Sequence, residues 1–314
     1  MIPAVVADAL VKIFPGPGGG QIRAVDGIEF QVQQGEIFGF LGPNGAGKTT
    51  TLEMVEGIRS VTSGTITVLG HNVATEQKKI KPLIGVQLQE QAYFKLMRLN
   101  EILDLFATFF EHPAPTGPLL EMVGLQDKAK AMVKELSGGQ ARRFSIAASL
   151  VNDPQVVFLD EPTSGLDPQA RRSLWDLVID LRSKGKTVVL TTHYMEEAET
   201  ICDRVAVIDH GKIQALNTPL RLIQELDSAY HIRFSTEGFV PEDKLLELPG
   251  AVRLTQEHQD ELTTYDLEVH DPALVIGDFK HILDSRGVSI QDLQIRPSTL
   301  EDVFLHLTGR ELRD

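Results

Sequence analysis

A glycine-rich segment, GPNGAGKTT at residues 42–50, contains residues of the types and spacing that hold phosphate groups. A strand-like run precedes it and a helix-like run follows it (36–41 and 50–58), which is the context that a phosphate-binding loop needs. Its glycines let backbone N–H groups surround an anion without Cβ clashes, and the N-terminus of the following helix adds partial positive charge. We therefore expect Lys48 to lie along the β- and γ-phosphates of a nucleotide and Thr49 to offer its hydroxyl to Mg²⁺.

Two adjacent carboxylates, Asp160 and Glu161, follow an apolar strand-like run at 155–160. Such a run delivers its last residues to the carboxyl edge of a sheet, where ligands of open α/β sheets bind. Asp160 is therefore expected to bind Mg²⁺, and Glu161 beside it is expected to polarise an attacking water. The alternative is an exposed acidic turn, but the phosphate loop upstream favours the functional interpretation.

Polar residues also follow two other strand-like runs. His193 comes directly after the run at 187–192, and Gln87 and Gln89 close another run. A lone histidine at a strand end is usually structural, but this one is expected at the same sheet edge as Asp160, within reach of a γ-phosphate. One of the two glutamines could reach Mg²⁺ or the attacking water, and their spacing alone does not distinguish them.

The segment LSGGQ, Leu136–Gln140, places two glycines and a serine between a charged run and a helix-like run. Such a segment can leave backbone N–H groups open to an anion. Taken alone it is a weak signal, and the chain already contains a stronger phosphate loop.

The first 220 residues alternate strand-like and helix-like segments, which predicts an α/β fold for a first domain, 1–220. Strands are expected at the N-terminus and at 28–32, 36–41, 65–70, 84–88, 155–160, 187–192 and 204–209. The last three runs are apolar at both alternating positions, as in a sheet that is covered on both faces. Between Leu99 and Val151 the pattern is helical without strands, so a helical subdomain is expected at about 90–152.

A second domain, 221–314, is predicted after a boundary near Thr218 and Pro219. Its helix-like and strand-like runs indicate a small α+β domain, with strands at 229–235, 251–255, 264–269 and 288–295 and helices at 272–285 and 298–312. Ser298 and Glu301 have the spacing of a capping box, so the last helix is expected to start there.

The 314 residues carry a formal net charge of −14, and the residues from Arg221 onward contain nine basic and 19 acidic side chains. An acidic surface argues against duplex nucleic acid as the main partner, because phosphate neutralisation needs clustered lysine and arginine. The sequence has no run of 18 apolar residues and no basic leader, so neither a membrane-spanning helix nor a signal peptide is expected. The single cysteine, Cys202, favours a reducing compartment and is expected to be a buried structural thiol.

Together these motifs resemble those of the nucleotide-binding subunit of an ATP-binding cassette (ABC) transporter, over roughly residues 4–220. Six motifs agree in order and spacing: Walker A (GPNGAGKTT), the Q-loop (IGVQLQE), the signature (LSGGQ), Walker B (VVFLDEP), the D-loop (SGLD) and the switch histidine (TTH). The resemblance assigns Gln89, and not Gln87, to the Q-loop position. It places Phe14 where the family has an aromatic residue that stacks on adenine, although Phe14 is also a candidate core residue; the adjacent Pro15–Gly20 is expected to be a flexible hairpin loop.

The resemblance implies that two chains pair head to tail, with ATP and Mg²⁺ between Walker A of one chain and the signature of the other. Glu161 is then the general base, His193 senses the γ-phosphate, and Gln89 is implied to be catalytic and to order Mg²⁺ together with Thr49 and Asp160. Asp167 is implied to communicate across the dimer. The residues implied to bind nucleotide are Phe14, Gly42, Pro43, Asn44, Gly45, Ala46, Gly47, Lys48, Thr49, Thr50, Ser137, Gly138, Gly139, Gln140 and Asp167.

The C-terminal sequence PSTLEDVFLHLTGRELRD resembles the tail of bacterial ATPase subunits from type-2 ABC exporters, the drug- and antibiotic-resistance group. The implied partner is a separate polytopic membrane permease, which would hold the chain in the cytoplasm at the inner face of the cell membrane. The alternative is a soluble ABC ATPase that acts on nucleic acid or ribosomes, but such proteins usually have a long coiled coil or two cassettes in one chain. An unrelated kinase or GTPase would leave LSGGQ and His193 unexplained. The transported compound and the role of the acidic second domain stay open.

Overall fold

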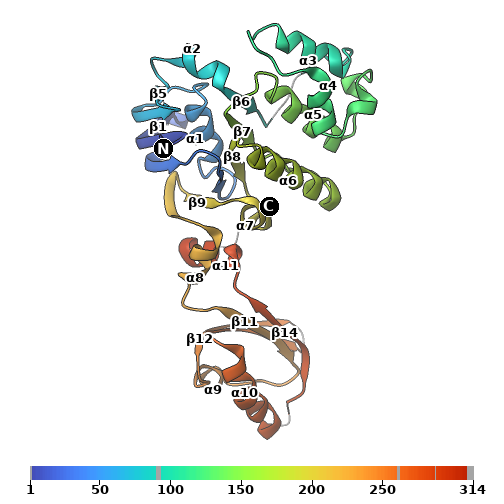
Figure 1. Ribbon diagram of the computed structural model, residues 1–314. Helices are drawn as coiled ribbons and strands as arrows, with labels where there is room; N and C mark the ends of the chain where they lie inside the picture. Colours follow the sequence, from blue (N-terminus) through green and yellow to red (C-terminus); the bar gives the residue numbers. More distant parts are fainter. Residues whose placement is uncertain (1, 90–92, 260–261, 287, 310–314) are drawn as a thin grey trace. The chain divides into compact units, whose positions relative to one another are not determined.

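The computed structural model describes residues 2–89, 93–259, 262–286 and 288–309. These residues form two compact units, which divide between Pro219 and Leu220 (Figure 1). The first unit contains a mainly parallel sheet and an antiparallel sheet with helices, and the second contains one antiparallel sheet with helices. The α/β fold class expected from the sequence, with a small α+β unit after it, is confirmed.

The six-stranded sheet of the first unit positions the residues that could do chemistry. Its strand order is β10-β9-β3-β8-β7-β6, in which β10 is antiparallel to β9 and the other neighbours are parallel. Every residue of β3, β7 and β8 is buried, as expected for strands that are covered on both faces. The carboxyl ends of these three strands therefore meet at one edge. The strands are β3 (Ile37–Leu41), β6 (Ile84–Gln87), β7 (Val156–Asp160), β8 (Thr187–Thr192), β9 (Arg204–Asp209) and β10 (Lys212–Asn217).

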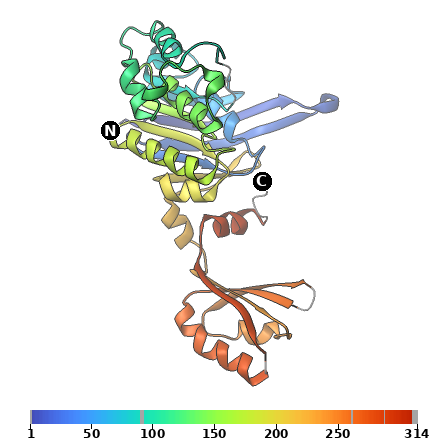
Figure 2. The ribbon, with the colours of Figure 1, turned by 90° about the vertical axis from the view of Figure 1, so that its right-hand side faces the viewer.

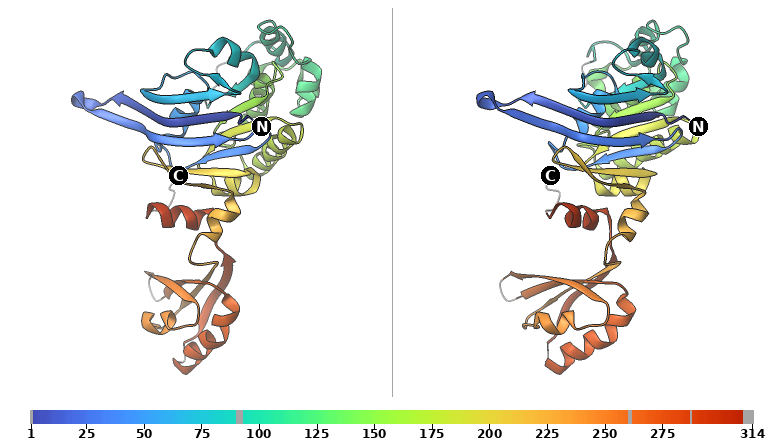
Figure 3. Two further views of the ribbon diagram at one scale, coloured as in Figure 1. Left: turned by 60° about the vertical axis from the view of Figure 1, so that its left-hand side comes forward. Right: turned by 90° about the vertical axis from the view of Figure 1, so that its left-hand side faces the viewer.

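A second, antiparallel sheet has the order β2-β1-β4-β5, and the sequence pattern did not separate it from the first. The two sheets share a core in which the rings of Phe30, Phe38 and Phe40 pack at centroid distances of 5.0–5.8 Å. The strands β1 and β2 form a long hairpin, and its tip lies away from the rest of the unit (Figures 2 and 3). The predicted turn after Phe14 is at this tip, where Pro17–Gly19 forms a 3₁₀ turn. The strands are β1 (Val5–Pro15), β2 (Gln21–Val32), β4 (Ser63–Val68) and β5 (His71–Asn72).

The helices of the first unit fall into two groups. Those that pack with the sheets are α1 (Lys48–Val55), α2 (Gln77–Ile80), α6 (Pro168–Ser183) and α7 (Met195–Ile201). Those of the predicted helical insertion are α3 (Leu99–Ala107), α4 (Thr116–Met122) and α5 (Gly138–Ser149), with 3₁₀ turns at Gln126–Lys128 and Val133–Glu135. Figure 1 shows α3, α4 and α5 gathered at one side of this unit. Between residues 93 and 151 the structure describes no named strand, only an isolated bridge between Arg98 and Met132.

The second unit is a four-stranded antiparallel sheet of order β12-β13-β11-β14, with α9 and α10 on one face (Figures 1 and 2). The chain order of its strands and helices is the β-α-β-β-α-β arrangement. Phe234, Tyr265 and Phe279 are central in its apolar core. Its elements are β11 (Tyr230–Thr236), α9 (Glu242–Leu246), β12 (Ala251–Gln259), β13 (Leu262–Val269), α10 (Pro272–Arg286), β14 (Ile290–Pro297) and α11 (Leu300–Thr308), preceded by α8 (Pro219–Gln224).

The capping box predicted at Ser298 and Glu301 is wrong by one residue. Helix α11 has Thr299 as its N-cap, and the carboxylate of Asp302 accepts a 2.8 Å hydrogen bond from the Thr299 backbone N–H. The Ser298 hydroxyl instead donates to the Ser228 carbonyl. Arg296 fixes the register, because it donates two hydrogen bonds to Asp302. None of the helices in the described ranges is both long and apolar enough to cross a membrane.

Candidate nucleotide-binding site

The phosphate loop follows β3 directly and has a backbone that only glycine adopts easily. Gly45 and Gly47 have φ values of +81° and +106°, in the left-handed region. A Cβ on Gly47 would also lie only 2.4 Å from the Ala24 carbonyl oxygen. The loop then passes into α1, whose first residue is Lys48. This strand, glycine loop and helix have the arrangement expected of an anion cradle.

The side chain of Lys48 is folded back into this loop. It is buried, and its Nζ donates to the carbonyl oxygens of Gly42 and Pro43 at 2.8 and 3.1 Å. Burial lowers the pKa of Lys48, and the Glu161 carboxylate, 3.5 Å from Nζ, opposes that effect. The Lys48 nitrogen thus lies inside the loop, at the place where an ammonium would pair with phosphate.

Asp160, the last residue of β7, is held by two hydroxyl groups. Thr49 Oγ1 donates to Asp160 Oδ1 at 3.1 Å, and the Thr191 hydroxyl on β8 donates to the same oxygen. Burial raises the pKa of Asp160, and the hydrogen bonds from Thr191 and Thr49 oppose that rise. A hydroxyl and a carboxylate at one edge suit Mg²⁺, which takes few protein ligands and otherwise water and phosphate oxygens. Among the residues that the structure describes, no cluster of three or more His, Cys, Asp or Glu side chains forms a metal cage.

Glu161 has an unusual backbone and three polar partners. Its φ of +44° is in the left-handed region, and its N–H donates to Thr191 Oγ1 at 2.9 Å. Its carboxylate lies 3.4 Å from His193 Nδ1, 3.4 Å from Gln89 Nε2 and 3.5 Å from Lys48 Nζ. His193 does most to hold the pKa of Glu161 below its usual range. The carboxylate is thus ionised and can accept a proton from water.

The structure separates the two glutamines that the sequence left open. Gln87 is buried in β6, and its amide donates to the neighbouring Leu88 carbonyl. Gln89 lies beyond the strand, and its side-chain amide donates to Glu161. Gln89, which the motif assigns to the Q-loop, thus lies beside Glu161, and among the described residues its side chain makes no direct contact with Thr49 or Asp160.

The signature residues begin helix α5. Ser137 is the N-cap, and Ser137 and Gln140 exchange hydrogen bonds between backbone N–H groups and side-chain oxygens at 3.1 and 3.3 Å. Gln140 also accepts from Lys128. A Cβ on Gly138 would meet nothing within 4 Å, so its backbone is open to an approaching group. In the described chain, the polar contacts of Ser137 and Gln140 remain within the helical part and do not reach the phosphate loop.

Two further predicted residues have local partners. Asp167 is the N-cap of α6, where its carboxylate accepts a 2.9 Å hydrogen bond from the Ala170 N–H. Phe14 is half-buried near the hairpin tip, and cations approach its ring: Lys12 Nζ at 5.3 Å and Arg59 Cζ at 5.1 Å from the centroid. An aromatic ring in contact with two cations at the surface is not a core ring.

Sequence reasoning missed several residues around the site. Thr191 was hidden inside an apolar strand, although its hydroxyl donates to the Asp160 carboxylate and accepts from the Glu161 backbone N–H. Arg142, two residues after the signature, donates from Nη1 to the Gln89 carbonyl oxygen at 3.2 Å. Burial lowers the pKa of Arg142. Its proximity to LSGGQ was the available signal, but an arginine on a helix is normally taken as a solvated side chain.

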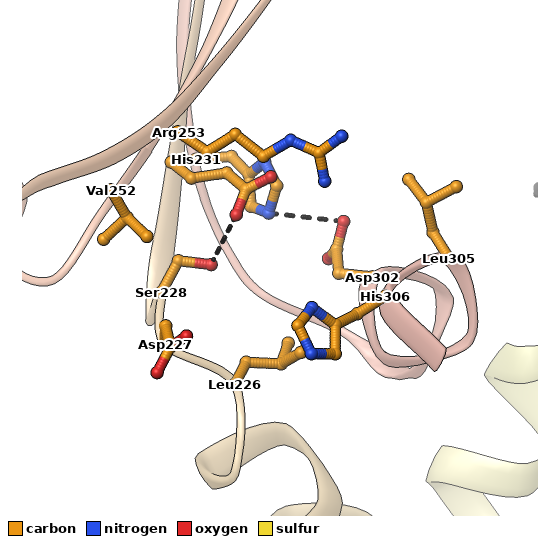
Figure 4. A pocket seen from close by; sticks show the side chains of 10 residues that line it. Leu226, Asp227, Ser228, His231, Val252, Arg253, Asp302, Leu305 and His306 are labelled. Carbon is orange, nitrogen blue, oxygen red and sulfur yellow. Dashed lines mark hydrogen bonds and ion pairs between the residues drawn. The ribbon is translucent and has the colours of Figure 1, made fainter. Parts of the chain in front are cut away.

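A separate cavity of about 250 Å³ lies within the second unit, between β11 and α11 (Figure 4). His231 lines it; its Nδ1 is 2.8 Å from Asp266, and its Nε2 is 3.3 Å from Asp302, which points toward it from α11. Ser228 donates to Glu268 at the same cavity. These contacts tie α11 to the sheet, and the lining contains no arrangement that resembles the phosphate loop.

Comparison with known proteins identifies the family. Residues 25–164 match the model of the ABC transporter family. The Nod factor export ATP-binding protein I of Ralstonia nicotianae is 39% identical over 300 residues, which cover 94% of this chain and 92% of that protein. The linearmycin resistance ATP-binding protein LnrL of Bacillus subtilis is 36% identical over 308 residues, with 94% and 96% covered.

Solved structures show the same cassette fold. The cbiO1 protein from Clostridium perfringens, part of the cbiONQ ABC transporter complex, has a TM-score of 0.63 and 26% identity, covering 72% of this chain and 92% of its own. A dimeric ATP-binding cassette bound to ADP and Pi has a TM-score of 0.62 and 24% identity, with 68% and 98% covered. The relatives named here are ATP-binding proteins of export or resistance systems, and none supports the nucleic-acid alternative. This chain belongs to the ABC transporter family and is the ATP-binding, ATP-hydrolysing subunit of an exporter.

Proposed function

We propose that two copies of this chain pair head to tail around two ATP–Mg²⁺ sites and that hydrolysis there drives export through a separate membrane permease. The observation that carries this proposal is the division of the site within one chain. Lys48, Glu161 and His193 converge at one sheet edge, whereas Ser137 and Gln140 bond only among helical residues. One of the structural neighbours is a dimeric cassette, which is compatible with pairing of two copies.

On the Walker A side, the open backbone of residues 42–50 and the ammonium of Lys48 would hold the phosphates. In the structure, Lys48 donates hydrogen bonds to carbonyl oxygens of the loop. It could exchange these bonds for bonds to phosphate oxygens without leaving the loop. Thr49, Asp160 and Gln89 would order Mg²⁺, which when bound neutralises the charge that develops on the phosphates. Phe14 would stack on the adenine.

Glu161 would act as the general base, because it is ionised and its position is fixed by backbone and side-chain contacts. His193, whose Nδ1 lies 3.4 Å from that carboxylate, would sense the γ-phosphate. The backbone of Ser137, Gly138, Gly139 and Gln140 of one copy would contact the phosphates held by the other copy. Asp167, which begins α6 beside these residues, would report on the approach of the second chain.

The named relatives suggest the class of compound. One relative is a Nod factor export ATP-binding protein, and another is a linearmycin resistance ATP-binding protein. We therefore propose a secreted or antibiotic small molecule as the exported compound. The permease would also keep the chain at the inner face of the cell membrane.

A mixing experiment tests the composite site. Lys48→Ala and Ser137→Arg should each abolish most ATP hydrolysis when purified alone. In an equal mixture, about half of the pairs are mixed, and each mixed pair regains one intact site, so roughly a quarter of the parental rate should return.

The matched control mixes Lys48→Ala with Glu161→Gln. These two residues lie 3.5 Å apart in one chain and belong to the same half of the site, so this mixture should regain nothing. No recovery in the Lys48→Ala and Ser137→Arg mixture, with both proteins folded and able to pair, would overturn the head-to-tail proposal.

A further inference from the structure

The imidazole of His193 faces the Glu161 carboxylate through Nδ1, but that contact is long for a bond that fixes a functional histidine. Its side chain is 14% exposed, and Nδ1 lies 3.4 Å from Glu161 Oε2. Nδ1 is buried, and its contact with Glu161 does not count as a hydrogen bond in the structure. The ring must therefore be oriented by what packs against it.

Tyr194 is that packing partner. The rings of His193 and Tyr194 have centroids 4.1 Å apart and an interplanar angle of 44°. The Tyr194 backbone N–H donates to Thr192 Oγ1 at 2.9 Å, which fixes the start of the tyrosine side chain. Any displacement of the tyrosine ring would accordingly move the histidine ring.

Arg171 in turn packs on Tyr194. The Arg171 Cζ lies 4.0 Å from the centroid of the tyrosine ring, a close cation–π contact. Its Nε is buried without a hydrogen-bond partner, so stacking on Tyr194 is the contact that the structure gives for this part of the guanidinium. Arg171 lies in the first turn of α6, and its backbone N–H bonds to the carbonyl oxygen of Asp167, the N-cap.

A buried carboxylate links helix α6, which carries Arg171, to helix α7, which Tyr194 precedes. Glu197 on α7 is fully buried and accepts a 3.0 Å hydrogen bond from Trp175 Nε1 on α6. Burial raises the pKa of Glu197, and the charge of Arg171 is among the effects that lower it. Helices α6 and α7 are thus joined by the hydrogen bond between Trp175 and Glu197, in addition to the stacking of Arg171 on Tyr194.

We propose that Arg171 is a positioning residue that, through the Tyr194 ring, holds the His193 imidazole against Glu161 and joins it to the helix that Asp167 begins. This inference rests on the proposed role of His193 in the ATP site. It adds a mechanical route within one chain: a shift at the start of α6 would be transmitted by one cation–π contact and one ring contact to the histidine.

The test compares the ATPase kinetics of the full-length variants Arg171→Met and Tyr194→Leu. Each should lower kcat roughly tenfold, because a displaced group loses its alignment with the reacting atoms, while the KM for ATP stays within about twofold. The kcat of the double variant should equal that of the slower single variant, because both substitutions remove the same support of the histidine. Tyr194→Phe, which keeps the ring, should retain most of the parental kcat.

Arg172→Met is the control, because Arg172 is the neighbouring exposed arginine on the same helix. Its kcat should equal that of the parent, and fluorescence of Trp175 should report a folded first unit in every variant. Multiplicative losses in the double variant, or a parental kcat in Arg171→Met, would overturn the inference.

His193→Ala distinguishes the two levels of the proposal. If it keeps parental turnover, the proposed function of His193 fails. If it loses turnover while Arg171→Met does not, the function of His193 stands and the positioning role of Arg171 fails.

Discussion

Replacing Glu56 by glutamine should stabilise the first unit relative to the parent, and this advantage should be larger at alkaline pH than at acid pH. Glu56 follows α1, is 7% exposed, and neither of its carboxyl oxygens has a hydrogen-bond partner in the structure. Burial, with the negative charge of Asp160 nearby, raises the pKa of Glu56 from 4.5 to about 8. The folded chain therefore binds this proton more tightly than the unfolded chain does.

The sign and size of the effect follow from that difference. Below pH 4.5 the carboxyl is protonated in both states and has no penalty; as pH rises toward 8, the unfolded state gains stability by ionising and the folded state does not. With about 1.4 kcal/mol for each pKa unit, the cost to folding is about 1 kcal/mol at pH 5, 2 at pH 6 and 4 at pH 8. Glu56→Gln does not titrate, so its stability advantage over the parent should grow by about 3 kcal/mol from pH 5 to pH 8.

Urea unfolding measured by tryptophan fluorescence is the assay. Trp175 is the only tryptophan in the sequence and is buried in the same unit as Glu56, so the signal reports that unit. Glu76→Gln is the control: Lys79 lowers the pKa of Glu76 to about 2, so this carboxyl titrates below pH 5 in both states. The difference between Glu76→Gln and the parent should be constant from pH 5.5 to pH 8. A constant difference for Glu56→Gln over that range would refute the reasoning, because it would mean that the buried carboxyl ionises as readily as in the unfolded chain.

Two further outcomes are expected. Glu161→Gln should lower kcat by at least about 100-fold, because it removes the general base, while equilibrium binding of labelled ATP stays near the parental value; turnover at the parental rate would remove Glu161 from that role. Asp302→Asn should destabilise the second unit by roughly 1–3 kcal/mol, because it weakens the paired hydrogen bonds from Arg296 and the cap of α11 at Thr299. Burial alone would raise the pKa of Asp302, but Arg296 and the Thr299 N–H hold it below its usual range. That stabilisation should accordingly be lost as the pH falls below about 4, which circular dichroism of the second unit can follow.

The sequence revealed those parts of the site in which the backbone conformation requires particular residue types. The phosphate loop needs glycine at Gly45 and Gly47 because of their positive φ values, so residue type reports the local conformation directly. The turn after Asp160 could also be predicted from residue types, because a proline that follows an apolar run marks the end of a strand. These signals come from residues that are neighbours in the sequence, so they can be recognised without knowledge of the packing.

The parts that the sequence did not reveal depend on tertiary contacts. The antiparallel sheet could not be separated from the parallel one, because β1 pairs not only with its hairpin neighbour β2 but also with β4, and β3 and α1 lie between β2 and β4 in the sequence. The capping box was misplaced by one residue because Ser-Thr and Glu-Asp are adjacent pairs with equivalent chemistry, and only the contacts of Arg296 choose between them. Thr191 gave no signal, since a fully buried strand rich in β-branched residues tolerates threonine whether or not its hydroxyl is used.

The same distinction explains why motif residues alone do not describe how the site works. Glu161 and His193 are identified by motif, yet the geometry between them is set by Thr191, which bonds to the Glu161 backbone, and by Tyr194, which packs on the histidine. The motif residues can therefore stay the same while the rate of ATP hydrolysis depends on neighbouring residues that the motif does not contain. Because Arg171 stacks on Tyr194 without a hydrogen bond at Nε, even a lysine there would keep the charge but lose the planar contact. The rate of the Arg171→Lys variant should consequently fall with that of Arg171→Met, which would show that shape rather than charge supports the histidine.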